Sequence, residues 1–149
     1  MILRYLAVFL IVFYYAGYVS YGNQPKDTLD IQQLMLQYQE SLRKSKYDKA
    51  LKDLNVLGDY LIYTELDHKE SYHYFKSFKP YIHNCSQSEE KAKFYINYAE
   101  AATYAQDFEG SLEVLKEGIE MMERNQDSSL YEFGYAYLKA AENSNKLNR

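Results

Sequence analysis

The chain is poor in the residues that make turns and cross-links. Its 149 residues include two prolines, six glycines, one cysteine and no tryptophan. So few prolines and glycines cannot supply the many tight turns of an all-β fold, and alternating runs of Val, Ile and Thr are also absent. The single Cys85 cannot form an internal disulfide. We expect Cys85 to be a small, partly buried residue, with a reactive or intermolecular thiol as the alternative.

The sequence also lacks a basic cluster. It carries 17 Lys and Arg against 21 Asp and Glu, a net charge of −4, and the two signs are mixed along every segment. Without residues 1–22 the chain loses only Arg4 and has a net charge of −5. Proteins that bind nucleic acids need a basic surface to neutralise phosphates. We therefore expect no nucleic-acid partner for this segment.

Motifs of catalysis and cofactor binding are absent too. There is no GxSxG, P-loop, GxGxxG, CxxC or HExxH sequence. His68, His73 and His83 lie near acidic residues, but their spacings do not match the three or four residues that place two ligands on one helical turn. We interpret them as solvated or packing residues. Four glutamates, which we interpret as a solvated helix face, follow later: Glu109, Glu113, Glu117 and Glu120. The expectation is no enzymatic activity, no metal and no cofactor.

Residues 1–22 differ from the rest of the chain. A short basic start is followed by 5–21, an uncharged run dense in Leu, Val, Ile and Phe, with the small residues Ser20 and Gly22 at its exit. This pattern is typical of a secretory signal peptide cleaved after Gly22. The alternative is an uncleaved membrane anchor, because 2–21 is about long enough to span a bilayer. In both cases we expect an exported chain, periplasmic or membrane-anchored and facing the periplasm.

After a linker at 23–27, hydrophobic residues recur at the 3.6-residue period of helices with one buried face. The period predicts an all-α domain at 28–149. Its six expected helices are 28–44, 45–61, 65–79, 87–105, 108–125 and 129–143. Pro80 should end or kink the third helix. Four pairs predict N-terminal caps by their spacing of three: Ser45–Asp48, Thr64–Asp67, Ser86–Glu89 and Ser129–Glu132.

The stretch 95–122 predicts a helical hairpin. Small residues on its first helix (Ala99, Ala102 and Ala105) would allow close approach of a hydrophobic stripe on the second, with a polar turn at 106–107. Internal similarity extends this unit. Residues 45–61 align with 106–122 at an offset of 61, and 98–110 align with 137–149 at an offset of 39.

These helix pairs resemble the tetratricopeptide repeat (TPR) family. The residues that carry the resemblance in the best repeat are Tyr95, Tyr98, Ala99, Ala102, Phe108, Ser111, Leu115 and Gly118. Those in the first repeat are Leu34, Gln37, Tyr38, Ser41, Tyr47, Ala50, Leu54 and Leu57. Tyr38 stands where the family has a small residue, and the offsets differ from the family's period of about 34. The segment 64–84 is therefore either a degenerate repeat or a single spacer helix.

The resemblance implies a right-handed α–α superhelix, a TPR-like solenoid, with a concave groove that binds a protein or peptide. Carried over position by position, the groove residues would be Gln32, Met35, Gln39, Arg43, Lys93, Ile96, Glu100 and Thr103. This mixed set has no Arg or Lys clamp for a peptide carboxylate. The alternative is that these residues are ordinary solvent-exposed positions.

On the offset of 39, Arg149 matches Gly110, so the chain stops as another second helix would begin. We therefore expect Tyr131, Tyr135 and Leu138 to be half exposed, and further repeats or another chain to cover that end. The function that fits is an exported, non-catalytic scaffold or sensory module for protein–protein interaction. The resemblance to exported sensory modules of bacterial regulators gives the alternative, the extracytoplasmic N-terminal half of a membrane-bound transcriptional regulator or sensor kinase. A third possibility is a membrane-tethered assembly factor.

Overall fold

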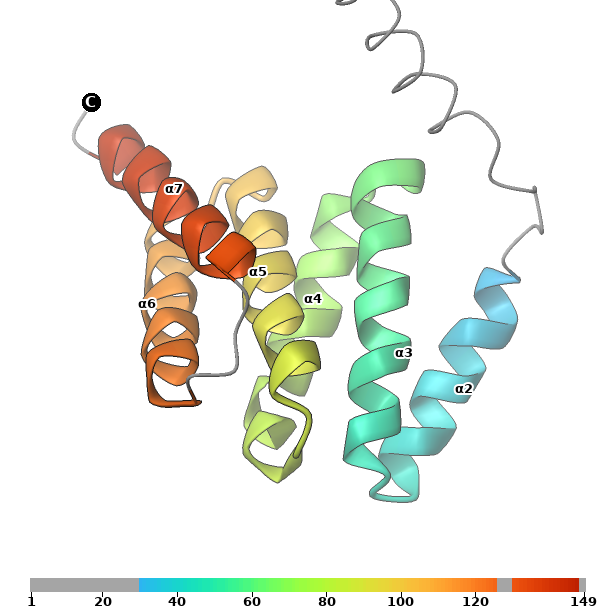
Figure 1. Cartoon of the computed structure of the whole chain (residues 1–149). Helices are drawn as coiled ribbons and strands as arrows, with labels where there is room; N and C mark the ends of the chain where they lie inside the picture. Colours follow the sequence, from blue (N-terminus) through green and yellow to red (C-terminus); the bar gives the residue numbers. More distant parts are fainter. Residues whose placement is uncertain (1–29, 126–129, 148–149) are drawn as a thin grey trace, which may run out of the picture. The chain divides into compact units, whose positions relative to one another are not determined.

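The computed structural model describes residues 30–125 and 130–147. All regular structure in these residues is helical (Figure 1), and the six α-helices are α2 (Ile31–Arg43), α3 (Tyr47–Tyr60), α4 (His68–Phe78), α5 (Ser88–Tyr104), α6 (Phe108–Asn125) and α7 (Leu130–Leu147). A π-helical turn, η1 (Leu61–Glu65), continues α3, and a 3-10 helix, η2 (Lys79–Asn84), continues α4. The predicted all-α class is confirmed for this part of the chain. The predicted signal peptide or anchor and the linker lie outside the described residues.

The segment between the two predicted hairpins contains one α-helix. The α4 helix ends at Phe78, and Pro80 lies in the first turn of η2. Proline is tolerated there because the amide group that it lacks would have no partner within the helix. Of the two interpretations of 64–84, the spacer helix describes what the structure has.

The helices pack in two layers (Figure 1). We call α3, α5 and α7 the odd layer and α2, α4 and α6 the even layer; in Figure 1, α3, α5 and α7 lie in front of α4 and α6. Within the even layer, the ring of Tyr38 from α2 lies 5.7 Å from that of Tyr74 and 6.3 Å from that of Phe78. Lys79, directly after α4, forms a 2.8 Å ion pair with Glu117 of α6. Each helix therefore contacts both its neighbour in sequence and the helix after that.

An aromatic core fills the space between the layers. Phe75 and Phe78 of α4 are fully buried against Phe94 of α5, with ring centroids 5.6 and 5.8 Å apart. Such edge-on and tilted contacts add to the free energy gained by burying each ring. Nine of the 17 residues of α5 are buried, because α5 packs on α3, α4, α6 and α7. A helix surrounded in this way needs apolar or small residues on most of its circumference.

The predicted hairpin of α5 and α6 is present, and small residues bring its helices together. A Cβ atom at Gly118 would lie 2.6 Å from Cβ of Tyr95, so only glycine fits there. Ser111 Oγ donates a 2.6 Å hydrogen bond to the backbone carbonyl oxygen of Ala99. Ala99 and Ala102 are buried, as expected for the close face of a hairpin.

The turns that close the α2–α3 and α5–α6 hairpins have the same geometry. Ser45 and Gln106 both adopt left-handed backbone angles, with φ of 55° and 66°. The amide of the following residue, Lys46 or Asp107, donates a 2.9 Å hydrogen bond to a carbonyl five residues earlier. This pattern is a common helix C-terminal motif. Ser45 and Gln106 are also paired by the offset of 61, so the alignment found in the sequence corresponds to a repeated turn.

The predicted helix caps were mostly wrong. Ser45 does not cap α3, and Ser86 does not cap α5. Instead, Asp48 accepts 2.7 Å hydrogen bonds from both the backbone amide and the hydroxyl of Ser86. Asp67, expected as the partner of a threonine cap, itself caps α4 by accepting from the amide of Glu70. The predicted Ser129–Glu132 cap lies outside what the structure describes.

Candidate interaction face on the odd layer

Polar side chains join α3 to α5. Three hydrogen bonds cross between the helices: Asn55 to Glu90 at 2.8 Å, Asn97 to Asp59 at 2.8 Å and Tyr63 to Glu100 at 2.5 Å. From one bond to the next, the residue number increases on both helices, so the two helices run in the same direction. We call these three hydrogen bonds the α3–α5 seam. A separate contact joins α4 to α5, where the ring of His68 stacks on that of Tyr104, with centroids 4.5 Å apart.

Glu100 is the most enclosed charged group of the seam. Its side chain is 6% exposed and accepts hydrogen bonds from the hydroxyls of Tyr63 on η1 and Tyr135 on α7. Among the described residues it forms no salt bridge. A buried carboxylate is costly unless hydrogen bonds replace the lost water. The two tyrosines supply these bonds, and they connect three segments of the odd layer at one point.

The environment of Glu100 shifts the pKa of its neighbours. Burial, followed by the hydrogen bond to Glu100, raises the pKa of Tyr63 well above its ordinary value. Burial and the charge of Glu100 raise the pKa of Tyr135 to about 12. Partial desolvation raises the pKa of Asp59, and the carboxylate of Glu100 raises it further. Both tyrosines therefore remain protonated donors at neutral pH.

Large apolar and aromatic side chains lie exposed beside the seam. On α3 and η1 these are Val56 and Tyr63, at 41% and 56% exposure. Tyr104 of α5 and Leu138 of α7 are exposed to a similar degree. Helical spacing places Val56, Asp59 and Tyr63 on one side of their helix, and Ile96, Glu100 and Tyr104 on one side of α5. We call the surface defined by Val56, Asp59, Tyr63, Ile96, Glu100, Tyr104, Tyr135 and Leu138 the odd-layer face.

Of the eight predicted groove residues, only Ile96 and Glu100 belong to this face. Four of the eight are on α2, in the even layer: Gln32, Met35, Gln39 and Arg43. Gln32, Gln39 and Arg43 are exposed, whereas Met35 packs against a small cluster around Leu34. In Figure 1, α3 lies between α2 and α5. The two predicted halves of the groove therefore do not form one surface.

The other predicted groove residues lie on α5, in the odd layer. Lys93 forms a 2.8 Å ion pair with Glu89, and Ile96 is half-buried. Thr103 belongs to a polar cluster between α5, α6 and α7, in which its hydroxyl lies 2.9 Å from that of Ser111. Asn143 of α7 donates a 2.7 Å bond to the same serine. Glu100 is thus the only one of the four that takes part in the seam.

Sequence reasoning missed Asp59, Tyr63 and Asn143. The signal that could have found them is a shared separation. Among the described residues, every side-chain hydrogen bond that joins one helix of the odd layer to another links positions 35 to 40 apart. Complementary polar residues at that separation indicate neighbouring parallel helices, a pattern that a hydrophobic period does not contain.

The cysteine and histidines have structural surroundings. Cys85 is buried, as expected, and burial raises the pKa of its thiol to about 11, which keeps it in the unreactive protonated form. His73 and His83 are exposed, while His68 of α4 stacks on Tyr104. Across residues 30–125 and 130–147, no three His, Cys, Asp or Glu side chains are grouped as metal ligands.

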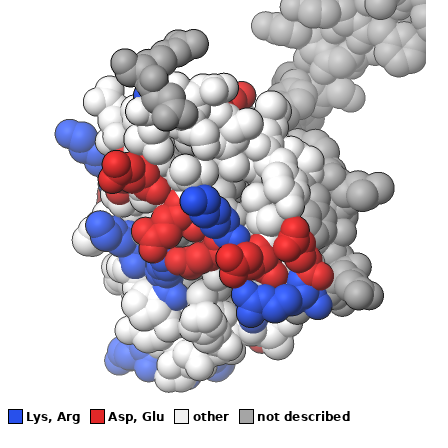
Figure 2. All heavy atoms as spheres, turned by 90° about the vertical axis from the view of Figure 1, so that its left-hand side faces the viewer, with Lys and Arg blue, Asp and Glu red and all other residues white. Residues whose placement is uncertain are grey.

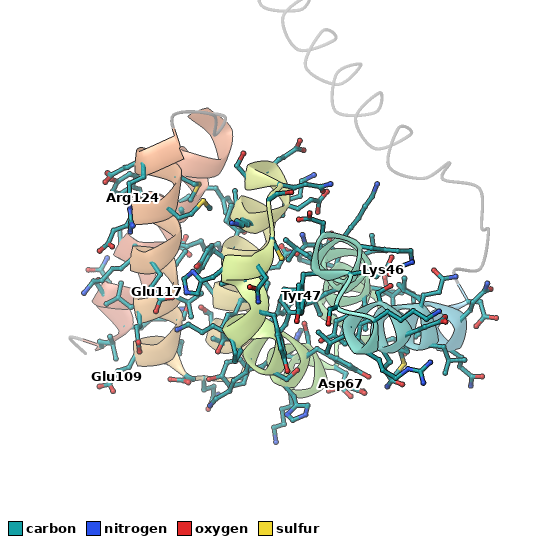
Figure 3. The ribbon with its side chains drawn as sticks, turned by 90° about the horizontal axis from the view of Figure 1, so that it is seen from below. Lys46, Tyr47, Asp67, Glu109, Glu117 and Arg124 are labelled. Carbon is teal, nitrogen blue, oxygen red and sulfur yellow. The ribbon has the colours of Figure 1, made fainter. Side chains whose placement is uncertain are left out.

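Acidic and basic side chains alternate on the face formed by α6 and α7 (Figure 2). Glu109, Glu113 and Glu120 are exposed on α6, in agreement with a solvated face. Glu117 differs, because it is half-buried in its ion pair with Lys79. Figure 3 shows Glu109, Glu117 and Arg124 along α6, seen from below.

Comparisons with known protein families, curated proteins and solved structures find no match. In the described part of the chain, no helix has the length and apolarity needed to cross a membrane. The predicted signal peptide or anchor at 1–22 is not part of that segment. The odd-layer face is therefore the candidate functional surface of the described residues.

Proposed function

We propose that the chain is a TPR-like solenoid that serves as a non-catalytic protein-interaction module. The observation that carries this proposal is the exposure of Val56, Tyr63, Tyr104 and Leu138 along three parallel helices. Aromatic and large aliphatic side chains supply most of the binding energy at protein interfaces. Hydrogen bonds through Glu100 fix these helices side by side, so the surface is preorganised for binding.

Charge indicates the chemistry of the partner. Asp59 and Glu100 form no salt bridge among the described residues. A Lys or Arg side chain of a partner would complement them, and its cation could also lie over the ring of Tyr63 or Tyr104. We therefore propose a protein or peptide segment in which basic and apolar residues alternate.

The proposed setting is outside the cytoplasm, as an exported scaffold or sensory part. The alternative is the extracytoplasmic part of a membrane-bound transcriptional regulator or sensor kinase. N-terminal sequencing of the exported product separates a cleaved form from a tethered one, since a start at Asn23 rules out an anchor in 2–21. The reading frame downstream shows whether an effector domain follows.

A matched pair of variants tests the face. Leu138→Glu adds a charge to the odd-layer face, whereas Leu36→Glu makes the same change on α2, where the leucine is 66% exposed. We would select peptides from a random library on the wild-type chain and measure their affinity for each variant. Leu138→Glu should bind at least roughly tenfold more weakly, and Leu36→Glu should bind as the wild type does. Equal losses in both variants, or selected peptides without basic residues, would count against the proposal.

A further inference from the structure

A cleft lies away from the odd-layer face. It has a volume of about 470 Å³ and lies between η2, the first half of α5 and the second half of α6. Its size is within the range of small-molecule sites in proteins. Glu117 and Arg124, two turns apart on α6 in Figure 3, mark its α6 side. None of the residues that define the odd-layer face lines it.

The cleft is locally positive in a chain of net charge −4. Its two acidic residues are neutralised, Glu117 by Lys79 at 2.8 Å and Glu120 by Arg124 at 3.3 Å. Lys91 is a third cation of the lining, and its ammonium has no hydrogen bond or ion pair among the described residues. The excess charge of the cleft therefore resides on Lys91.

Asp48 lies outside the cleft lining, and its pKa is lowered first by hydrogen bonds from Ser86 and to a smaller extent by the charge of Lys91. Both carboxylate oxygens of Asp48 are already engaged by Ser86. Asp48 forms no ion pair with Lys91, so the ammonium can form a direct contact with an anion from solution.

Tyr95 adds a hydrogen-bond donor to the cleft. The residue is 5% exposed, and its hydroxyl has no hydrogen-bond partner within the described part of the chain. The hydroxyl is not fully enclosed by protein atoms. Because Tyr95 lines the cleft, its hydroxyl is open to it. Burial raises its pKa, so it remains a donor at neutral pH. Ile82 and Met121 contribute apolar surface to the same lining.

We infer that this cleft binds a small anion with a short apolar body. Its carboxylate or phosphate head group would lie beside the ammonium of Lys91 and the hydroxyl of Tyr95. Its body would contact Ile82 and Met121. Charge-assisted hydrogen bonds from an ammonium are among the stronger polar contacts. The inference is independent of the proposed function, since the two surfaces share no residue.

The test is a titration of the isotope-labelled full chain, followed by the backbone amide signals of η2 and α6 in NMR spectra. Hexanoate and hexyl phosphate should each give saturable shifts, and hexylamine should give none.

Lys91→Ala should weaken hexanoate binding about tenfold, because it removes the unpaired cation. Tyr95→Phe keeps the ring and should weaken it about fivefold. Lys52→Ala removes an exposed lysine of α3 outside the cleft and should change nothing.

Several outcomes would overturn the inference. These are hexylamine binding as well as hexanoate, unchanged affinity in Lys91→Ala, and the absence of saturable shifts with either anion. Binding of inorganic phosphate without binding of hexanoate would equally reject it, since the apolar half of the site would then have no role. Loss of peptide binding at the odd-layer face would not affect these results.

Discussion

The space between the layers and the seam within the odd layer are held together by different forces. Between the layers, Phe75, Phe78 and Phe94 are fully buried and make no directional bonds through their side chains. In the seam, buried Asn97 and Glu100 are matched to hydrogen-bonding groups on the neighbouring helices. Hydrophobic burial is large but does not depend on direction. Hydrogen bonds contribute less, but they depend on distance and angle.

The comparison assigns a separate role to each region. The aromatic core supplies a large part of the free energy that opposes unfolding, through burial that does not by itself select which polar groups meet. The seam adds register, because a shift of one residue separates Asn55 from Glu90 and Tyr63 from Glu100 together. The polar contacts therefore determine which helices lie side by side and at what register.

The largest expected effect comes from the core. Phe75→Ala should lower the free energy of unfolding by about 3–5 kcal/mol, because it removes a fully buried ring and leaves a cavity next to Phe94. Urea denaturation followed by circular dichroism measures this change. Tyr104→Ala truncates a half-exposed ring beside the seam and should cost clearly less. Equal costs would contradict the assigned roles.

A smaller effect is expected from the polar cluster between α5, α6 and α7. Asn143→Ala should cost about 1–3 kcal/mol, because it leaves the buried hydroxyl of Ser111 without one of its partners. The control is Asn145→Ala, an exposed asparagine of the same helix. Both variants would be compared in the same denaturation experiment. If Asn145→Ala were as costly, the loss would reflect helix propensity and not the buried contact.

A polar contact in the even layer tests the comparison between hydrophobic burial and hydrogen bonding further. Asp107 accepts hydrogen bonds from Tyr72 at 2.5 Å and from the amide of Gly110 at 2.9 Å, capping α6. Asp107→Ala should cost about 1 kcal/mol at neutral pH, and Glu109→Ala, at an exposed neighbour, should cost little.

The hydrogen bond from Tyr72 is the first cause of the lowered pKa of Asp107. Because the pKa is lower in the folded state, the stabilisation is present above the ordinary value of 3.8 and disappears as the pH falls below it. The difference in the free energy of unfolding between the wild type and Asp107→Ala should therefore become smaller in acid. A difference that stayed constant down to the lowest pH would exclude an ionised cap.

The smallest effect concerns alkaline pH. The pKa of Tyr135 is raised from 10.0 to about 12 in the folded chain, mainly by burial. A raised pKa in the folded state means that stability is fully present below pH 10 and is lost as the pH rises toward 12. Tyr135→Phe has no hydroxyl to titrate, so it should not show this loss of stability between pH 10 and 12. Denaturation curves measured across that pH range test this. Identical alkaline curves for the two proteins would show that the hydroxyl of Tyr135 is not held in the seam.

The helices were predictable because the residues that each helix buries recur at the 3.6-residue helical period. The stripe that ends in Leu115, Ile119 and Met122 follows the helical period, and the turn at Gln106 and Asp107 separates two such stripes. The caps were not predictable. Ser86 has the correct local spacing to cap α5, but Asp48 binds it from 38 residues away. A local pattern contains no information about such a competitor.

The candidate face could be predicted only in part. Ile96 and Glu100, two of the groove residues predicted from the clearest repeat, belong to the odd-layer face. Placing α2 on the same surface failed. The single helix α4 between the hairpins puts the first helix of one pair and the first helix of the other in opposite layers. The offset of 61 residues does not say how many helices that distance contains.

The separations of the polar contacts have a consequence for how the chain folds. In the described residues, side-chain hydrogen bonds between helices join positions either 8–14 or 32–40 apart. The entropy lost in closing a loop grows with its length, and chains with short loops fold quickly. During synthesis, each helix would find all of its partners once about 40 further residues had left the ribosome. We therefore expect structure to grow from the N-terminal hairpin toward α7 as the chain emerges, without waiting for the last helix.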